Sequence, residues 1–226
     1  NAESQSTGFV HADVHDVEYN PLNGHVYLGS DGGLVKSTND GIDWTNLSDG
    51  IATSQAYHMA GSLLDIDHMM IGLQDNGCKR RDANTNVWDS TIGGDGFDCI
   101  YDWDSSTSGY ATSNSKIYRF EDNGDTNTEI TGDSNQFFTR VTCAIDDPAV
   151  VLAGLNDIWK SSDGGETWFN KGATGCWDLE RCPSNVNRFY ASGGSSSFAT
   201  SGSMYRSSDK GETWTLISNS PGYPLF

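Results

Sequence analysis

The sequence predicts an all-β protein of the β-propeller class with five four-stranded blades, and three observations lead to this prediction. First, a short motif begins at residues 37, 81, 120, 161 and 207, so successive copies are 44, 39, 41 and 46 residues apart. Second, short aromatic and β-branched runs alternate with turn-forming residues in each repeat. Third, the chain holds 26 Gly and lacks the long Ala, Leu, Glu and Lys runs typical of helices. A period of about 40–45 residues with a turn in every unit is typical of propellers.

The recurring motif, which we call the box hairpin, has two nearly identical copies. Residues 161–168 read SSDGGETW and residues 207–214 read SSDKGETW. Residues 37–44 (STNDGIDW) keep the Ser, Gly and Trp, whereas 81–88 (RDANTNVW) and 120–126 (FEDNGDT) are weaker copies. The acid can accept backbone N–H bonds within the turn, the Gly takes a conformation that a Cβ hinders, and the Trp packs on the sheet. We therefore predict a structural rather than catalytic role for these box residues: Ser37, Gly41, Trp44, Trp88, Asp122, Gly124, Ser161, Asp163, Gly165, Trp168, Ser207, Asp209, Gly211 and Trp214.

The sequence around the boxes supplies the four strands of each blade. Apolar runs such as 150–154 (VVLAG) and 157–160 (DIWK) precede the box hairpin, and an earlier run often ends at a Pro-marked turn, as in 141–148 (VTCAIDDP). The predicted blades are residues 8–50, 51–92, 93–132, 133–172 and 173–217 of one domain covering 1–226. Residues 218–226 resemble the lead-in to a further blade, so we expect the five blades to be part of a larger propeller.

The charge balance limits the classes of partner. Lys and Arg total 13 against 31 Asp and Glu, which gives a net charge of −18. This charge repels nucleic acid and anionic membrane surfaces, so neither is an expected partner. No apolar run approaches the ~20 residues of a membrane span. The five cysteines show no paired CxxC motif, which excludes a typical zinc site, although one or two disulfides fit an exported protein.

A second set of polar residues is predicted on the rim opposite the box hairpins. The third strand of a blade joins a turn on one rim to the box turn on the other, so starts of first strands and turns between second and third strands share a rim. From the first strands this rule collects His11, Asp13, His15, His58, Asp95, Asp98 and Arg140. From the turns it collects Asp31, Gln74, Asp75, Asn76, Asn156 and Asp157. We expect a ligand to bind among these residues.

Residues 11–15 (HADVH) are the most suggestive part of this set. Alternation along a strand would place His11, Asp13 and His15 on one face. Such a row could bind a transition metal, but side chains two apart on a strand are ~6–7 Å apart, so a hydrogen-bonded polar row is preferred and no metal is assigned. The Asp-Gly and Asn-Gly turns at 30–33 and 74–77 could offer oxygen ligands to Ca²⁺. No calcium-binding sequence pattern is present, and no organic cofactor is expected.

The box hairpin resembles the BNR/Asp-box repeat of sialidases, sortilin-type receptors and xyloglucan-specific glycoside hydrolases, and the resemblance covers essentially the whole chain. Segments 11–16 (HADVHD), 28–33 (LGSDGG), 72–77 (GLQDNG) and 93–98 (GGDGFD) are similar to sortilin-like propeller proteins of Bacteroidetes, often exported by type IX secretion. The resemblance implies an extracellular or cell-surface protein whose ligand binds on the face opposite the boxes.

Two functions follow from these observations. The first is a non-enzymatic module that binds a glycan or a protein, as in adhesion. The second is a glycoside hydrolase of the xyloglucanase-like Asp-box type, with paired carboxylates drawn from Asp31, Asp75 and Asp95. The binding module is preferred because those relatives place the two acids in two facing propellers. A sialidase is excluded because only Arg140, of seven arginines, falls on the predicted rim and the Phe/Tyr-Arg-Ile-Pro signature is absent.

Overall fold

The computed structural model describes residues 10–51, 54–82, 84–130, 139–173, 176–193 and 202–217. These residues form five four-stranded antiparallel sheets, each a meander in which consecutive strands are neighbours. Sheet 1 comprises β1 (Val14–Asn20), β2 (His25–Ser30), β3 (Gly33–Ser37) and β4 (Thr45–Asn46). Sheet 2 comprises β5 (Ala56–Gly61), β6 (Met69–Leu73), β7 (Gly77–Asp82) and β8 (Val87–Ile92). Sheet 3 comprises β9 (Gly96–Tyr101), β10 (Gly109–Ser113), β11 (Lys116–Glu121) and β12 (Thr126–Glu129). Sheets 4 and 5 comprise β13 (Arg140–Cys143), β14 (Val151–Gly154), β15 (Ile158–Ser161) and β16 (Phe169–Asn170); and β17 (Cys176–Arg181), β18 (Phe189–Gly193), β19 (Ser203–Ser207) and β20 (Thr215–Leu216).

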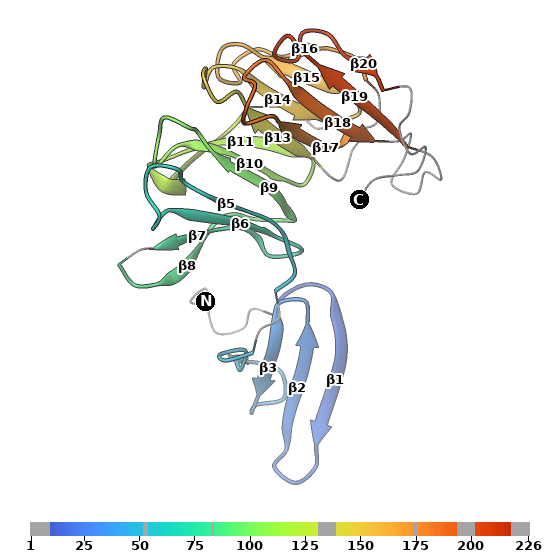
Figure 1. Ribbon diagram of the computed structural model, residues 1–226. Helices are drawn as coiled ribbons and strands as arrows, with labels where there is room; N and C mark the ends of the chain where they lie inside the picture. Colours follow the sequence, from blue (N-terminus) through green and yellow to red (C-terminus); the bar gives the residue numbers. More distant parts are fainter. Residues whose placement is uncertain are drawn as a thin grey trace.

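The five sheets are the blades of a partial propeller, which confirms the predicted fold class. Sheets 2 to 5 follow one another in an arc (Figure 1), with the first strands β5, β9, β13 and β17 as successive neighbours on the inside. The described ranges contain one short 3-10 turn, Asp122–Gly124, and no helix that is long and apolar enough to cross a membrane. The proposed lead-in 218–226 lies outside the described residues.

The hydrophobic core lies between successive sheets. Met70, Cys99 and Phe120 belong to the cluster between sheets 2 and 3. A second cluster between sheets 3 and 4 contains Tyr110 and Val151. The third cluster, between sheets 4 and 5, has as its largest members Leu152, Ile158, Leu179 and Phe189. Because β-strand side chains alternate between faces, each of these sheets contributes one face to each neighbour.

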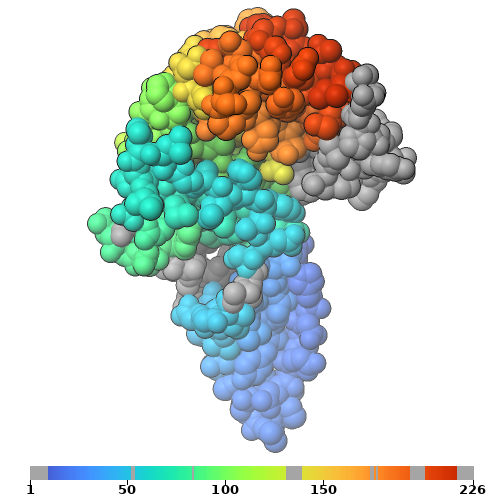
Figure 2. All heavy atoms as spheres, in the orientation of Figure 1, coloured from blue at the N-terminus to red at the C-terminus, as the bar shows by residue number. Residues whose placement is uncertain are grey.

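Sheet 1 is packed differently from the other four. None of the three core clusters contains a residue of 10–51, and sheet 1 projects from the arc as a separate lobe, blue in Figure 2. Large apolar side chains of β1 are therefore exposed: Val14 by 48%, Val17 by 56% and Tyr19 by 60%. The described contacts that tie sheet 1 to sheet 2 are polar and lie at one rim, where the candidate site is found.

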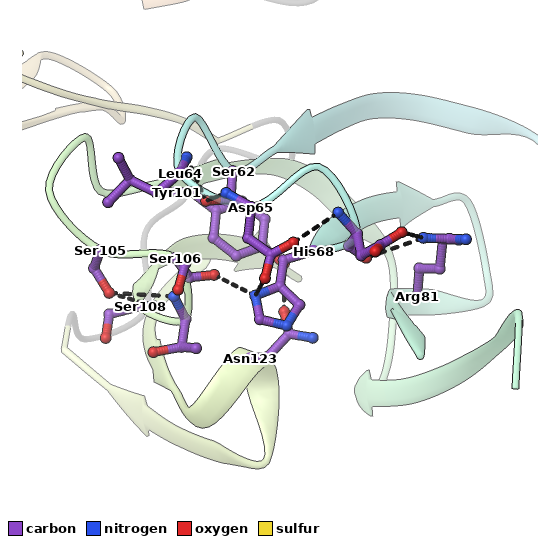
Figure 3. A network of polar contacts seen from close by, with 12 residues as sticks. Ser62, Leu64, Asp65, His68, Arg81, Tyr101, Ser105, Ser106, Ser108 and Asn123 are labelled. Atoms are coloured by element: carbon purple, nitrogen blue, oxygen red, sulfur yellow. Dashed lines mark hydrogen bonds and ion pairs between the residues drawn. The ribbon is translucent and has the colours of Figure 1, made fainter. Parts of the chain in front are cut away.

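Polar contacts also join the loops of neighbouring sheets on the box side (Figure 3). His68, in the loop that follows β5, donates from Nδ1 to the Ser106 carbonyl in the loop after β9, at 2.8 Å. Tyr101 donates its hydroxyl to Asn123 Oδ1 at 2.5 Å. Arg81 binds the Asp67 carboxylate at 2.9 Å. The His68 bond joins the loops of sheets 2 and 3, whereas the Tyr101 and Arg81 bonds fix the hairpin tips within sheets 3 and 2, respectively.

The box hairpins at 161–168 and 207–214 share the hydrogen bonds made by their Ser and Asp side chains. Ser161 Oγ accepts the Gly165 N–H at 2.8 Å, Asp163 Oδ1 accepts the Thr167 N–H at 2.9 Å, and Trp168 Nε1 donates to the Gly165 carbonyl at 2.9 Å. In 207–214 the Ser and Asp bonds are repeated at 2.8 and 2.9 Å. In 37–44 Asn39 Oδ1 takes the place of the carboxylate, accepting the Asp43 N–H at 2.9 Å.

These bonds predict a loss of stability in acid. Hydrogen bonds from the Thr167 hydroxyl and N–H lower the pKa of Asp163 to about 2. Partial desolvation raises the pKa of Asp209, but hydrogen bonds from Thr213 and Ser207 outweigh this effect and lower the pKa to about 2. A lowered folded-state pKa stabilises the protein above the ordinary value near 3.8, and that contribution is lost as the pH falls from about 4 to 2. We expect the urea midpoint to fall over this range, and to fall less steeply in the Asp163→Asn/Asp209→Asn double variant. Parallel curves for the two proteins would contradict this prediction.

The five cysteines form no disulfide, unlike the one or two bridges that the sequence allowed. Cys78, Cys99, Cys143 and Cys176 are buried thiols, and Cys182 is half-buried. Burial raises the pKa of Cys78 to about 12, so this thiol is neutral and packs as a small apolar group.

Candidate functional site

The turns between second and third strands lie at the opposite ends of the third strands from the box hairpins. In sheet 1, β3 joins the turn at Asp31 to the box that begins at Ser37; in sheet 4, β15 joins the turn at Asp157 to the box at Ser161. The predicted rim residues separate into two groups and one isolated turn. One group, the rim cluster, lies between sheets 1 and 2 and is built around His15, Asp13, Asp31, Asp75 and Asn76. The other, the inner belt, lies along the first strands and contains His58, Asp98 and Arg140.

A β-bulge shapes the start of the first strands. The pairing register shifts between Val14 and Asp16 in β1, and between Ala56 and His58 in β5, leaving one extra residue in each strand. The extra residues are His15 and Tyr57. Bulges next to functional sites re-aim side chains. Here each side chain contacts the rim turn of its own sheet: His15 contacts Asp31, and Tyr57 contacts Gln74.

His15 and Asp31 form the first contact of the rim cluster. His15 Nε2 lies 2.5 Å from Asp31 Oδ1. His11, in contrast, contacts the Asp75 carbonyl of sheet 2 through Nε2 at 3.0 Å and packs over Gly32. The prediction that 11, 13 and 15 alternate on one strand face is therefore wrong: β1 begins only at Val14, and Asp13 has a left-handed φ of 57°.

The turn of sheet 2 connects this contact to sheet 3. Asn76 Nδ2 donates to the Asp31 carbonyl at 3.4 Å. The Asp75 N–H donates to Asp95 Oδ1 at 2.9 Å, and Asp75 itself takes a left-handed φ of 57°. The Asp95 N–H in turn donates to Asn114 Oδ1 at 2.9 Å. One continuous polar chain thus crosses three sheets along the rim.

Three carboxylates converge in the rim cluster. Oxygen atoms of Asp13, Asp31 and Asp75 lie within 4.8 Å of one another. Hard cations such as Ca²⁺ prefer oxygen ligands, so these three residues are where the described chain could hold one. No metal had been assigned from the sequence, because the spacing along a flat strand separates Asp13 from its neighbours. The turn conformations bring the three acids together.

The contacts within the rim cluster shift the pKa values of its members in opposite directions. The hydrogen bond from His15 lowers the pKa of Asp31, and the same bond raises the pKa of His15. Partial desolvation and the negative charges of Asp95 and Asp31 raise the pKa of Asp75. At neutral pH the cluster therefore combines an ionised Asp31 with an Asp75 that holds a proton more readily than an isolated carboxyl.

The rim cluster borders a pocket of about 170 Å³. Its lining is entirely polar: Ser30, Asp31, Gln55, Gln74, Asp75 and Asn76. Tyr57 donates its hydroxyl to Gln74 Oε1 at 2.9 Å and so fixes that amide beside the pocket. The sequence rule missed Ser30, Gln55 and Tyr57. Ser30 opens the predicted turn at 30–33, whereas Gln55 and Tyr57 belong to no turn motif and their position close to His58 was the only signal for them.

The inner belt contains the predicted residues His58, Asp98 and Arg140. His58 Nδ1 lies 2.8 Å from Asp98 Oδ1, and Arg140 Nε lies 3.9 Å from Asp178 Oδ1. The Asp98 side chain is 6% exposed, so it belongs to the framework and not to a surface. Its hydrogen bond to His58 raises the pKa of the imidazole. These residues lie within the first strands β5, β9 and β13 and do not join the rim cluster.

Asn156 is separate from both groups. It is exposed in the turn between β14 and β15, where the neighbouring Asp157 accepts a bond from Asn170 Nδ2 at 2.7 Å. The Ser- and Gly-rich sequence of residues 193–202 also predicts a recognition loop, and residues 194–201 of it lie outside the described residues.

The rim cluster places several carboxylates on one surface. The nearest oxygens of Asp13, Asp31 and Asp75 lie within 4.8 Å of one another. Together they present several acceptors to a ligand that carries hydroxyl or amide donors.

Comparisons with known proteins show the fold. No family model and no curated protein matches the sequence. Among solved structures, a GH74 enzyme from Niastella koreensis superposes with a TM-score of 0.65 at 14% identity, over 96% of this chain and 39% of its own. An ancestral GH74 enzyme gives 0.62 at 16%, over 98% and 34%. The extracellular domain of a B. thetaiotaomicron protein assigned to the hybrid two-component systems gives 0.56 at 11%, over 100% and 31%. The chain thus spans about two fifths or less of these neighbours.

Proposed function

We propose that this chain is a glycan-binding propeller module of a secreted or cell-surface protein, and that the glycan binds at the rim cluster between sheets 1 and 2. The observation that carries the proposal is the pocket itself, whose six lining side chains are all polar and come from both sheets. Sugar recognition depends on many hydrogen bonds to hydroxyl groups. Carboxylate and amide groups held by a hydrogen-bonded chain supply acceptors and donors without further ordering.

The Asp-box repeat and the similarity to sortilin-like Bacteroidetes proteins support the extracellular part of the proposal. Two box hairpins share the same closing bonds around Ser161, Asp163 and Gly165 and around their counterparts in 207–214. A net charge of −18 also suits a protein that must stay soluble outside the cell. One structural neighbour is an extracellular domain. The module would function within a longer propeller.

A glycoside hydrolase is the second candidate, and two observations favour it. Two of the structural neighbours are GH74 enzymes. In addition, Asp31 and Asp75 differ in the direction of their pKa shifts, as a base and an acid must. The hydrolase is the second candidate because the xyloglucanase-like relatives place the two acids in two facing propellers.

Binding should be measured by glycan array and then by calorimetry with the best ligand. Asp31→Asn and Asp75→Asn are each expected to weaken binding at least tenfold, because a hydrogen bond to a charged group contributes about 1.5–3 kcal/mol and 1.4 kcal/mol is a factor of ten. Repeating the titration with EDTA and then with excess Ca²⁺ tests whether Asp13, Asp31 and Asp75 hold a cation that the ligand requires.

The matched control is Asp157→Asn, which makes the same chemical change in the rim turn of sheet 4 and should leave the affinity unchanged. Equal losses in the control and the site variants would place the ligand elsewhere. Reducing-sugar release from β-glucans that disappears in Asp31→Ala would establish the hydrolase instead. An absence of glycan ligands together with specific capture of a protein would replace the glycan with a protein ligand.

A further inference from the structure

The pocket of about 170 Å³ beside the rim cluster, which we call the rim pocket, has a negative charge that the chain balances only in part. Two of its six lining side chains are carboxylates, Asp31 from sheet 1 and Asp75 from sheet 2, and none is a Lys or Arg. A third carboxylate, Asp13, lies beside them. Among the described residues, only His15 brings a group that can carry a positive charge into contact with one of the three, at Asp31 Oδ1.

Other junctions between sheets are built differently. Arg80 of sheet 2 binds the Asp125 carboxylate of sheet 3 at 2.6 Å, and Lys160 of sheet 4 binds Glu212 of sheet 5 at 2.6 Å. In both cases one sheet supplies the cation and its neighbour the acid. The described hydrogen bonds between sheets 1 and 2 run from side chains to backbone carbonyls and include no such pair. The rim pocket is therefore a junction where both sheets supply acids and neither supplies a Lys or Arg.

The side chains of the rim pocket have hydrogen-bonding capacity left for a ligand. Asp75 makes its described hydrogen bonds through its backbone, from its N–H to Asp95 and from its carbonyl to His11. Within the described residues no N–H group donates to its carboxylate. Gln55 is exposed, and Gln74 is held in place by the Tyr57 hydroxyl at 2.9 Å. The pocket thus offers acids and, beside them, amides that can both donate and accept.

An ammonium group fits the spacing of the three carboxylates. It has three N–H donors, and a charge-assisted bond to a carboxylate is ~2.8 Å long. Tetrahedral directions then place the three acceptors about 4.6 Å apart. The nearest oxygens of Asp13, Asp31 and Asp75 lie within 4.8 Å of one another. A calcium ion, in contrast, takes 6–8 oxygen ligands, of which these three side chains supply only a part.

A neutral sugar hydroxyl fits the same position less well. It has one donor, so it would displace water from three carboxylates and bond to only one of them. Removing water from a charged group is unfavourable unless an opposite charge or several hydrogen bonds replace it. The remaining space is small: about 170 Å³ holds five or six waters at ~30 Å³ each, which is the scale of one sugar ring.

We propose that the glycan bound at the rim cluster contains a 2-amino-2-deoxy sugar with a free amine, whose ammonium group lies between Asp13, Asp31 and Asp75. This inference rests on the proposed glycan-binding function and adds the class of sugar. Hydroxyl groups of the same ring bond to the amides of Gln55 and Gln74. A sugar amine suits the pocket better than a Lys side chain, because the four-carbon stem of Lys would meet no apolar side chain in the lining.

The test compares two ligands that differ only at the nitrogen: the glucosamine tetramer, with free amines, and the N-acetylglucosamine tetramer of the same linkage. Calorimetric titrations of the whole chain are done with EDTA at about pH 6, where a typical amine is charged and a typical Asp is ionised. The free amine is expected to bind at least tenfold more tightly, a difference of about 1.4 kcal/mol. Asp31→Asn and Asp75→Asn should each bring the affinity ratio of the two tetramers close to one. A folding defect would weaken both ligands and leave this ratio unchanged.

Two controls separate the site from a general attraction to an acidic protein of net charge −18. Asp40→Asn removes the same charge from the exposed box turn at the far end of β3, and Asn tolerates the φ of 58° found there. This variant should keep the wild-type ratio. The N-trimethylated glucosamine tetramer keeps the positive charge and has no N–H donor, so it should bind more weakly than the free amine. Equal affinity for the two charged tetramers, or a ratio lost in Asp40→Asn, would overturn the proposal.

The remaining outcomes distinguish this inference from the proposed function. If the acetylated tetramer binds as tightly as the free amine and both are lost in Asp31→Asn, the glycan site stands and the ammonium group is wrong. If no glycan binds, amine or neutral, the proposed function itself fails. Binding that EDTA abolishes and Ca²⁺ restores would assign the three carboxylates to a metal ion. Tighter, Asp31-dependent binding of a lysine oligopeptide would replace the sugar with a protein ligand. Both of these results would overturn the proposal.

Discussion

Replacing Gly211 with alanine is expected to lower the free energy of unfolding by about 3 kcal/mol. Two effects add at this position. Gly211 has a φ of 81°, in the left-handed region that costs an L-residue about 1–2 kcal/mol. A Cβ there would also lie 2.5 Å from Leu152 Cδ2, and Leu152 is fully buried between sheets 4 and 5. Overpacking of a closed core typically costs another 1–3 kcal/mol.

Gly172→Ala is the matched control for this variant. Gly172 belongs to the same folded block and has a φ of 73°, but no atom lies within 4 Å of an added Cβ. It therefore reports the backbone strain alone, and we expect a loss of about 1 kcal/mol. Urea unfolding of both variants gives the two values. Equal losses would show that Leu152 moves aside freely and that Gly211 has room for a Cβ.

Asp98→Ala is expected to destabilise the protein by about 3 kcal/mol, because one buried carboxylate serves three strands. Asp98 Oδ2 accepts the Val141 N–H at 3.0 Å, and Oδ1 accepts the Cys99 N–H at 2.9 Å and lies 2.8 Å from His58 Nδ1. Val141 and Cys99 are buried, so their N–H groups would lose their acceptors without gaining water. Each buried unsatisfied donor costs about 1–3 kcal/mol.

Asp178→Ala is the control on the inner belt. Its carboxylate is 56% exposed, lies 3.9 Å from Arg140 and accepts the Leu179 N–H at 3.1 Å, so we expect a smaller loss of about 1 kcal/mol. The pH dependence provides a second readout. The pKa of His58 is raised in the folded protein, so its pairing stabilises fully below the ordinary value of 6.5 and is lost as the pH rises through the folded value. Asp98→Ala should abolish that alkaline decline, and an unchanged decline would assign it to another group.

The candidate site was only partly predictable. Turn motifs located Asp31 and Asp75 because Asp-Gly and Asn-Gly pairs mark hairpins, and propeller geometry put both turns on one rim. The grouping was not predictable, because the register shift that turns His15 and Tyr57 sideways has no sequence signature. The same rule placed His58 and Arg140 with the rim residues, although they lie on the inner belt with Asp98 and Asp178.

The sequence by itself determined the repeat, the strand order within each sheet and the position of the box hairpins, since these depend on local chemistry: a glycine at positive φ, a side chain that accepts N–H bonds within its own turn, and alternating apolar residues. The tertiary structure alone decided which box glycines are buried, which carboxylates meet, and that β1 keeps exposed apolar side chains. Those properties arise from contacts between residues of different sheets, whose distances depend on how the sheets stack and not on any neighbour in the chain.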